Sequence, residues 1–491
     1  MILRILLAAL SILLGMWLRR RREHFRYFHY LGVPGPEPNL IFGNLLEIYL
    51  KNSLWAVNDW HRKFGPVVGL FYGKNPVLLV SDPIILKKVF NDDRNFTNRS
   101  PHFNFPGVPN SVACLSGDDW RQLRTLLSKH YTEEGICRFS PEVKNCVDEL
   151  LKVVKKQSAK GSREFDISAI YDAFALDTIC RTTCGLAYDI QSDQRNRLLG
   201  FINKMKPPFG LRDLFRTSLP QLNLIFEGVR RKVLALMHGS VRKTSPLQEM
   251  HEDCSKRVKM LRSSKKPAGN DLLTVMLAEG YEVTDKQAID NSVLNVLAGY
   301  DTTSGALSFI TNMLIRYSEV QDRLRTELQE AFPGGSEVTP QKLKECRYLD
   351  AVIRETLRMY APVYMYTSRT SENPVQIGDL YIQEGLTVMA STREMHYTEE
   401  LYPEPERFNP DRFLVDDLSQ FDDIWIPFGA GPRHCLGKNL AMLAVKFVLA
   451  KMVLTYKLDT FEYLPQSRVE LQANPGLLKL KTGLRCRASP V

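Results

Sequence analysis

The segment FGAGPRHCLG, residues 428–437, surrounds a single cysteine, Cys435. Its glycines allow the backbone to wrap closely around one sulfur and to turn N–H groups toward it. A helical pattern begins directly after Cys435 and continues through Leu440, Val445 and Val448. We therefore expect the sulfur at the amino terminus of a helix, where the helix dipole favours a thiolate.

Several kinds of site could use such a cysteine, and the sequence favours one of them. A zinc site would need three more ligands, and no CxxC or paired histidines accompany Cys435. A nucleophilic cysteine would need a histidine base, and His434 should point elsewhere in a tight turn. A thiolate that is the sole protein ligand of a haem iron fits best, with an inert buried cysteine as the alternative.

The composition is that of an ordinary globular protein, with 491 residues, 44% hydrophobic and 24% charged. The formal net charge of +10 suits an anionic membrane or an acidic protein partner. No zinc-finger spacing or RNA-recognition motif is present, so we expect no nucleic-acid partner. The nine cysteines are scattered and odd in number, which argues against a disulfide framework and for a reducing compartment.

The amino terminus predicts a single-pass membrane anchor and basic stop over residues 1–22. Residues 5–18 are nearly all apolar and four arginines follow at 19–22. About 20 apolar residues cross a bilayer, with tolerance down to about 17. A cleaved signal peptide would carry its charge before the apolar stretch, whereas here it follows, which places the rest of the chain in the cytosol. Residues 23–39 include VPGPEP at 33–38 and are predicted to form a stiff, proline-rich hinge.

Residues 40–491 are predicted to form one domain, because no repeat or low-complexity linker divides them. The charged stretch from Lys243 to Asp271 is expected to be a surface loop within that domain. Together the patterns predict a mainly α fold with small β-sheets (α+β). Strand-like runs and long helical patterns lie at Val67–Phe71, Val77–Ser81, Pro141–Lys156, Glu319–Ala331, Val375–Val388 and Val469–Leu484.

One helix is predicted to cross the whole domain. Thr284 and Gln287 form a capping box, and the helical pattern runs to about Tyr317, which corresponds to about 50 Å. The segment AGYDTT, residues 298–303, lies in its middle and contains poor helix formers. Two interpretations stay open: a bulge at a functional site, or a glycine needed for close helix packing.

The run at 428–437 resembles the haem-binding loop of the cytochrome P450 superfamily at every family-defining position. The resemblance extends from about Pro34 to the carboxyl terminus. The local sequences at residues 96–99, FTNR, and at residues 427–437 are most similar to those of the animal group that contains drug oxidisers and thromboxane synthase. Further matching segments are WRQLR at 120–124, AGYDTT at 298–303, ETLR at 355–358 and PDRF at 410–413, where Asp411 stands in place of the commoner Glu.

This resemblance implies a cytochrome P450 fold with haem b between the long central helix and the helix that follows the cysteine loop. Cys435 would bind the iron and Phe428 would pack near the sulfur. Asp301 and Thr302 would relay protons, the alternative being a surface carboxylate and a packing residue. The haem propionates would be neutralised by Trp120, Arg124, Arg369 and Arg433, with Arg99 joining them by similarity to the subgroup, unless these residues form ordinary surface ion pairs.

The same resemblance implies a structural ion triad and a lipophilic substrate pocket. The triad would consist of Glu355, Arg358 and Arg412. The segments expected to line the pocket are rich in apolar residues, which suits a lipophilic ligand. They are Ser100–Ser116, Phe201–Leu214, Val296–Thr303, Val363–Tyr366 and Pro475–Leu478.

The expected activity is that of a microsomal monooxygenase in the endoplasmic reticulum membrane. It would insert one oxygen atom from O2 into a xenobiotic, steroid or fatty acid, using NADPH electrons. The expected partners are NADPH–cytochrome P450 reductase and, as a second candidate, cytochrome b5. Arg121, Lys129 and Lys438 could dock the donor or simply form a solvated charged face. The alternatives are a haem-thiolate isomerase of an endoperoxide-like lipid, which needs no external electrons, and a haem carrier or sensor.

Overall fold

The computed structural model describes most of the chain, and every structural statement below refers to the residues it describes. These are residues 1–100, 105, 107–159, 164–193, 196–204, 210–221, 228, 245–264, 269–278, 283–365, 367–462, 464–465, 469–474 and 476–491. Most of the predicted site lies within them. Parts of three predicted pocket segments, Ser100–Ser116, Phe201–Leu214 and Val363–Tyr366, lie outside them, as does Pro475.

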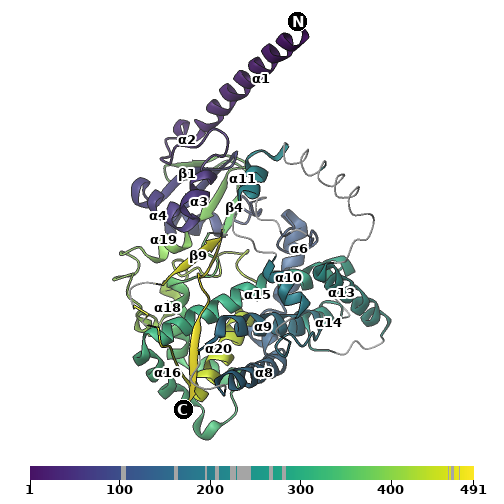
Figure 1. Ribbon diagram of the computed structural model, residues 1–491, viewed down its shortest axis with the longest axis vertical. Coiled ribbons are helices and arrows are strands. Elements are labelled where there is room, and N and C mark those ends of the chain that lie inside the picture. Colours follow the sequence, from purple (N-terminus) through teal and green to yellow (C-terminus); the bar gives the residue numbers. More distant parts are fainter. Residues whose placement is uncertain are drawn as a thin grey trace.

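Helices dominate the molecule and small sheets flank them, as the sequence predicts (Figure 1). The amino-terminal part contains α1 (Ile2–Phe25), α2 (Tyr27–Tyr30), α3 (Leu45–Lys51), α4 (Ser53–Phe64) and α5 (Pro83–Asn91). The body contains α6 (Gly117–Ser128), α7 (Glu133–Cys137), α8 (Ser140–Ser158), α9 (Ile167–Ile179), α10 (Arg197–Lys204), α11 (Leu211–Ser218), α13 (Pro246–Ser263), α14 (Leu272–Met276), α15 (Asp285–Arg316), α16 (Ser318–Ala331), α17 (Pro340–Glu345), α18 (Arg347–Met359), α19 (Thr392–His396) and α20 (Lys438–Thr455).

The sheets join segments that are far apart in the sequence. In the described chain one mixed sheet has the order β1-β2-β7-β4, in which β2 and β7 are parallel and the other neighbours are antiparallel. Its strands are β1 (Val67–Tyr72), β2 (Asn75–Val80), β7 (Thr387–Ala390) and β4 (Ser368–Thr370). The smaller sheets pair β5 (Val375–Ile377) with β6 (Leu380–Ile382), β9 (Leu471–Asn474) with β10 (Leu477–Leu480), and β11 (Arg485–Pro490) with both β3 (Phe165–Asp166) and β8 (Tyr456–Asp459).

The central helix α15 has the predicted length and start. Thr284 caps it, because its hydroxyl accepts from the Gln287 N–H at 3.2 Å while the Gln287 side chain accepts from the Thr284 N–H at 3.0 Å. The helix is continuous through Gly299, so the predicted alternative of a bulge is wrong. A Cβ at Gly299 would lie 3.0 Å from the Cδ1 of Ile179 in α9. The glycine therefore serves close packing of two helices.

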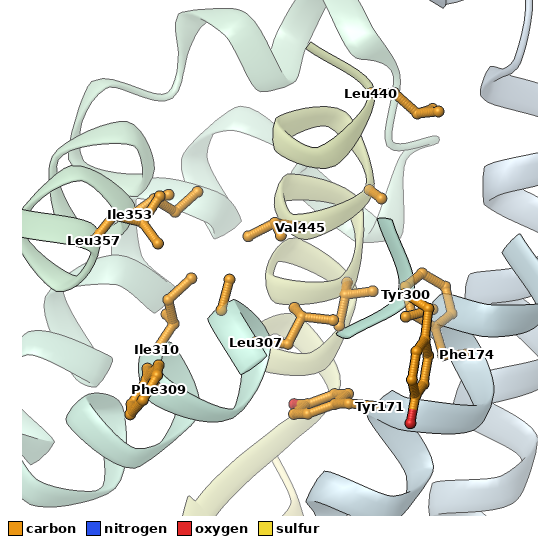
Figure 2. Packing of buried hydrophobic residues seen from close by; sticks show 14 of the residues in the cluster. Tyr171, Phe174, Tyr300, Leu307, Phe309, Ile310, Ile353, Leu357, Leu440 and Val445 are labelled. Carbon is orange, nitrogen blue, oxygen red and sulfur yellow. The ribbon is translucent and has the colours of Figure 1, made fainter. Parts of the chain in front are cut away.

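The core is built around α15, which packs against α9, α18 and α20. Figure 2 shows apolar side chains from all four helices directed toward one another. The Tyr171 hydroxyl, on α9, is buried and forms a hydrogen bond of 2.9 Å with Thr311 of α15. This packing gives the helices around the predicted site a rigid frame.

The prediction of a surface loop from Lys243 to Asp271 is wrong, because α13 occupies residues 246–263. Ser245 and Gln248 form a capping box at its start. Buried apolar side chains then recur at helical spacing, at Met250, Cys254, Val258 and Leu261. Glu252, Lys256, Lys259 and Arg262 lie on the exposed face of this helix, whereas Arg257 turns inward and donates to the buried Asp271 at 2.6 Å.

The amino-terminal helix α1 projects away from the body (Figure 1). It has a mean hydropathy of 1.9 over its most apolar window, and none of that window is buried. Among the described helices it has the length and composition needed to cross a membrane. The first part of the predicted hinge is helical, because α1 continues to Phe25 and α2 follows it. The proline-rich segment at 33–38 has no helix or strand, and the Pro34 carbonyl accepts a 2.8 Å hydrogen bond from Gly69 of β1.

Candidate active site

The loop at 428–437 folds back on itself so that its cysteine faces the interior. The Cys435 N–H donates to the Phe428 carbonyl at 2.8 Å, and the His434 N–H donates to the Gly431 carbonyl at 2.9 Å. Gly431 has a φ of +67°, and a Cβ there would lie 1.8 Å from the Phe90 carbonyl oxygen of α5. Only glycine can hold the loop against α5 at this position.

The sulfur of Cys435 opens into a cavity of about 400 Å³ between the loop and α15. Burial raises the pKa of the Cys435 thiol, while the Gly437 N–H and the charges of Arg124 and Arg99 act in the opposite direction. The chain therefore orients the sulfur but does not fully stabilise its anion. A metal cation bound to the sulfur would supply the missing stabilisation, because a coordinating thiol is deprotonated outright.

The cavity is surrounded by a group of arginines from four separate segments, which we call the pocket arginines. Their main-chain contacts fix them: Arg99 donates to the Arg433 carbonyl at 3.1 Å, and Arg369 donates to the Ala430 carbonyl at 3.0 Å. The Trp120 ring lies under the Arg433 guanidinium, 4.1 Å from ring centre to the charge. The group consists of Arg99, Arg124 on α6, Arg369 on β4 and Arg433 in the cysteine loop.

The pocket arginines have no carboxylate partner among the described residues. None of them forms an ion pair there, and the Nε and Nη1 atoms of Arg433 are buried without a hydrogen-bond partner. Burial, followed by the neighbouring positive charges, lowers the pKa of Arg433 to about 9 and that of Arg369 well below its ordinary value. Such a cluster is unfavourable unless an anion binds to it. The carboxylates of a haem b would fit.

The two residues of the predicted proton relay occupy neighbouring positions on α15. Thr302 lines the cavity and its hydroxyl donates to the Ala298 carbonyl at 2.8 Å. Asp301 is buried, and its carboxylate forms an ion pair with Lys479 of β10. No sequence pattern indicated this lysine, since a lysine in a terminal hairpin ordinarily points to solvent.

The Glu355–Arg358–Arg412 triad forms as expected, and we call it the inner triad. Arg358 donates to both oxygens of Glu355, at 2.7 and 2.9 Å, and Arg412 donates to Oε1 at 3.2 Å. Neither Glu355 nor Arg358 is exposed. The buried His396 joins this triad to the cysteine loop: its Nδ1 lies 2.9 Å from the Arg358 carbonyl, and its Nε2 accepts from the Ile426 N–H at 3.1 Å.

Most of the predicted pocket segments reach the cavity, but one does not. The segments Val363–Tyr366 and Pro475–Leu478 each contribute one residue, Val363 and Leu477, to the cavity lining. No described residue of Phe201–Leu214 lines the cavity. Sequence reasoning missed one wall, formed by α9. This helix is apolar on nearly all sides, so its pattern does not indicate which face borders a cavity. The residues that line the cavity from the predicted segments and from α9 are Phe105, Val112, Ala113, Leu297, Ala298, Gly299, Asp301, Thr302, Thr303, Val363, Leu477, Phe174, Ala175, Thr178 and Ile179.

The three basic residues near the loop have different environments. Arg121 is held by Asp118 at 2.7 Å and by the Asp93 carbonyl at 2.7 Å, so it has a structural role. Lys438 is half-buried beside the Trp425 ring, and Lys129 is exposed. Of the three, Lys129 is the most accessible to a docking protein.

Comparison with known proteins agrees with this geometry. The family model "Cytochrome P450" matches residues 33–484. The chain is 28% identical over 449 residues to lithocholate 6-beta-hydroxylase of Mesocricetus auratus, covering 89% of this chain and 87% of that protein. It is 28% identical to cytochrome P450 3A9 of Rattus norvegicus, covering 92% and 90%, and 29% identical to cytochrome P450 3A6 of Oryctolagus cuniculus, covering 97% and 94%. The chain therefore belongs to the cytochrome P450 family and is a monooxygenase that carries haem b with a cysteine thiolate on the iron.

Proposed function

We propose that Cys435 is the thiolate ligand and that the pocket arginines, with Trp120, hold the haem carboxylates. The observation that carries this assignment is that Arg369 and Arg433 are buried and form no ion pair with any described residue, at the cavity into which the Cys435 sulfur opens. Phe428 lines the same cavity, and its carbonyl accepts from Cys435, which suits a residue that shields the sulfur. When bound, the haem supplies the activation of O2.

The ligand assignment is tested with Cys435→Ser. We expect the variant to lose the red-shifted ferrous–CO band that marks a thiolate ligand. Cys137→Ser, at a partly exposed cysteine outside the loop, serves as the control and should keep the band. A Cys435→Ser protein that retained the band would contradict the assignment.

The reaction in the cavity consumes two protons together with two electrons, and we propose that Asp301 and Thr302 deliver the protons. The balance in the cavity is RH + O2 + 2 e⁻ + 2 H⁺ → ROH + H2O, and NADPH supplies the electrons at the donor protein, where it becomes NADP⁺ and releases one H⁺ to solvent. Thr302 would hold a proton at the cavity wall through its hydroxyl, and the Asp301 carboxylate would reload it from the protein side. Both residues line the cavity from the same turn of α15, which supports a shared role.

Thr302→Ala tests this relay. We expect NADPH to be consumed while hydrogen peroxide replaces most of the oxygenated product, because the proton donor at the cavity wall is lost. Thr326→Ala is the matched control, because the Thr326 hydroxyl likewise donates to the carbonyl four residues earlier but lies on the exposed face of α16. Unchanged product per NADPH in Thr302→Ala would remove Thr302 from the mechanism.

The substrate class that we propose is a lipophilic xenobiotic, steroid or fatty acid. The cavity walls contributed by α9 and by Val112, Leu297 and Val363 are mostly apolar, which favours a ligand of that kind. The name of the hamster relative specifies hydroxylation of lithocholate, which makes steroid acids a sensible first choice.

We further propose how the chain is divided and where it works. Residues 1–22 would be a single-pass anchor in the endoplasmic reticulum membrane, 23–39 a hinge, and 40–491 a cytosolic catalytic domain. The exposed apolar helix α1 supports the anchor. The electron donor would be NADPH–cytochrome P450 reductase, with cytochrome b5 as a second candidate, docking near Lys129.

The deciding experiment measures product from steroids, fatty acids, endoperoxides and drug-like compounds, with and without NADPH and reductase. We expect product only when both are present, with one oxygen atom derived from ¹⁸O2. Product from an endoperoxide without NADPH would instead identify an isomerase. Haem binding with no turnover of any compound would identify a carrier.

A further inference from the structure

A lysine from the last hairpin of the chain contacts the middle of the central helix. Lys479 of β10 forms an ion pair with the Asp301 carboxylate of α15. The side chain of Asp301 is 4% exposed, whereas that of Lys479 is 35% exposed. The pair therefore extends from the cavity wall, which Asp301 lines, to a surface that solvent reaches.

The hairpin is held firmly enough to place this lysine. The Leu478 N–H donates to the Pro362 carbonyl at 2.9 Å, and the Tyr364 N–H donates to the Gly476 carbonyl at 3.3 Å. On the other side, a Cβ at Gly305 of α15 would lie 4.0 Å from the Leu478 carbonyl oxygen. β10 is thus fixed between α15 and the segment at 362–364, and Lys479 follows directly from Leu478.

A buried carboxylate at this place needs a compensating charge. An ionised carboxylate is costly to bury unless it is paired, and a neutral carboxyl cannot accept a proton from solvent. The positive charge of Lys479 meets this need, and it reaches Asp301 from the side that solvent enters. Lys479 is not among the described residues that line the cavity, so its contact is with the carboxylate and not with a substrate.

We propose that Lys479 is a positioning residue for proton delivery: its ion pair orients the Asp301 carboxylate, and protons from solvent enter the relay at the hairpin surface beside it. This inference rests on the proposed role of Asp301. For each of the two protons that a turnover consumes, Asp301 takes a proton from solvent beside Lys479 and passes it toward Thr302. The carboxylate is thereby restored, and no bond to carbon changes in this transfer.

The test compares Lys479→Met with Lys479→Arg, which keeps the charge. Positioned proton transfer contributes about 10²–10⁴-fold to rates, so partial loss should lower product per NADPH by roughly tenfold in Lys479→Met. The substrate KM should stay within about twofold, and the D2O solvent isotope effect on product formation should rise. Lys479→Arg should restore most of the product. Lys481→Met is the matched control, because Lys481 lies two residues further on and pairs with Glu470 at the exposed surface.

A second readout uses the resting protein and needs no turnover. The melting temperature should fall in Lys479→Met, and adding Asp301→Asn should recover part of that fall, because the side chain that loses the lysine contact then carries no charge. Additive changes in melting temperature would show that the two side chains do not interact and would overturn the proposal.

The outcomes also separate this inference from the proposed relay. If Asp301→Asn loses product while Lys479→Met keeps normal product and isotope effect, the relay stands and the role of Lys479 is wrong. If Lys479→Met lowers only the melting temperature, the lysine is a structural strap and the inference is again overturned. If Asp301→Asn behaves as wild type in coupling and isotope effect, the relay itself fails.

Discussion

Two groups of arginines lie in the same domain and differ in the source of the negative charge that compensates them. The inner triad contains its own acid, since Glu355 accepts from both Arg358 and Arg412. The pocket arginines form no ion pair within the part of the chain that the structure describes, and burial followed by neighbouring positive charges lowers the pKa values of Arg369 and Arg433. The first group is complete when the chain folds, whereas the second is complete only when an external anion binds.

This difference separates a structural group from a binding group by physical means. Arg358 also donates to the His396 and Pro405 carbonyls, both at 2.8 Å, so almost all of its donors are used inside the chain. Two of the Arg433 nitrogens have no partner within the described residues. Buried donors are nearly always paired, so donors left over around a cavity indicate the ligand that they will bind.

The largest expected effect comes from breaking the inner triad. Glu355→Gln leaves the Arg358 charge buried without its anion, so we expect the free energy of unfolding to fall by about 3–5 kcal/mol. Denaturant unfolding of the purified protein measures this. Glu404→Gln is the matched control, because Glu404 pairs with Arg407 at an exposed site, where such pairs contribute about 0–1 kcal/mol. Equal losses in the two variants would abolish the distinction between the groups.

A smaller effect, on haem and not on the fold, is expected at the pocket arginines. Hydrogen bonds to charged groups contribute about 1.5–3 kcal/mol, so Arg369→Leu should raise the rate of haem loss by roughly 10- to 100-fold. Transfer of haem to an acceptor protein measures that rate. The haem-free protein should be no less stable than its wild-type counterpart, because one of several like charges is removed. Arg323→Leu, at a surface pair with Asp411, should change neither quantity.

The effect with the smallest expected size per step, here one pH unit, is the pH dependence of stability that comes from His396, the histidine beside the inner triad. Burial lowers the pKa of His396 to about 3, from an ordinary value near 6.5. Between these values the unfolded chain binds a proton that the folded protein does not, so stability is full above pH 6.5 and is lost as pH falls. We expect a loss of about 1.4 kcal/mol per pH unit from this group. His396→Gln should flatten the slope of stability against pH between about 6 and 4, whereas exposed His29→Gln should leave it unchanged.

Much of the site could be predicted because its chemistry is local in the sequence. The loop around Cys435 and the capping box at Thr284 are continuous stretches whose geometry follows from the residues themselves. The contact between Lys479 and Asp301 joins a hairpin to a helix, and no spacing in the chain encodes it. The α13 helix was not predicted because a stretch rich in charged residues is also typical of a surface loop. Its buried residues lie at helical spacing, which is the pattern that indicates the helix.

His396 connects the inner triad to the segment that leads into the cysteine loop. Its ring links the Arg358 carbonyl to the Ile426 N–H, and the chain from Ile426 leads directly into the loop that carries Cys435. Because every group in this link belongs to the protein, the side of the cavity formed by the cysteine loop is held without haem. The pocket arginines on the other side become favourable only when the haem carboxylates enter. On the proposed assignment, haem would bind to a site of which one side is already held by the inner triad and the His396 link.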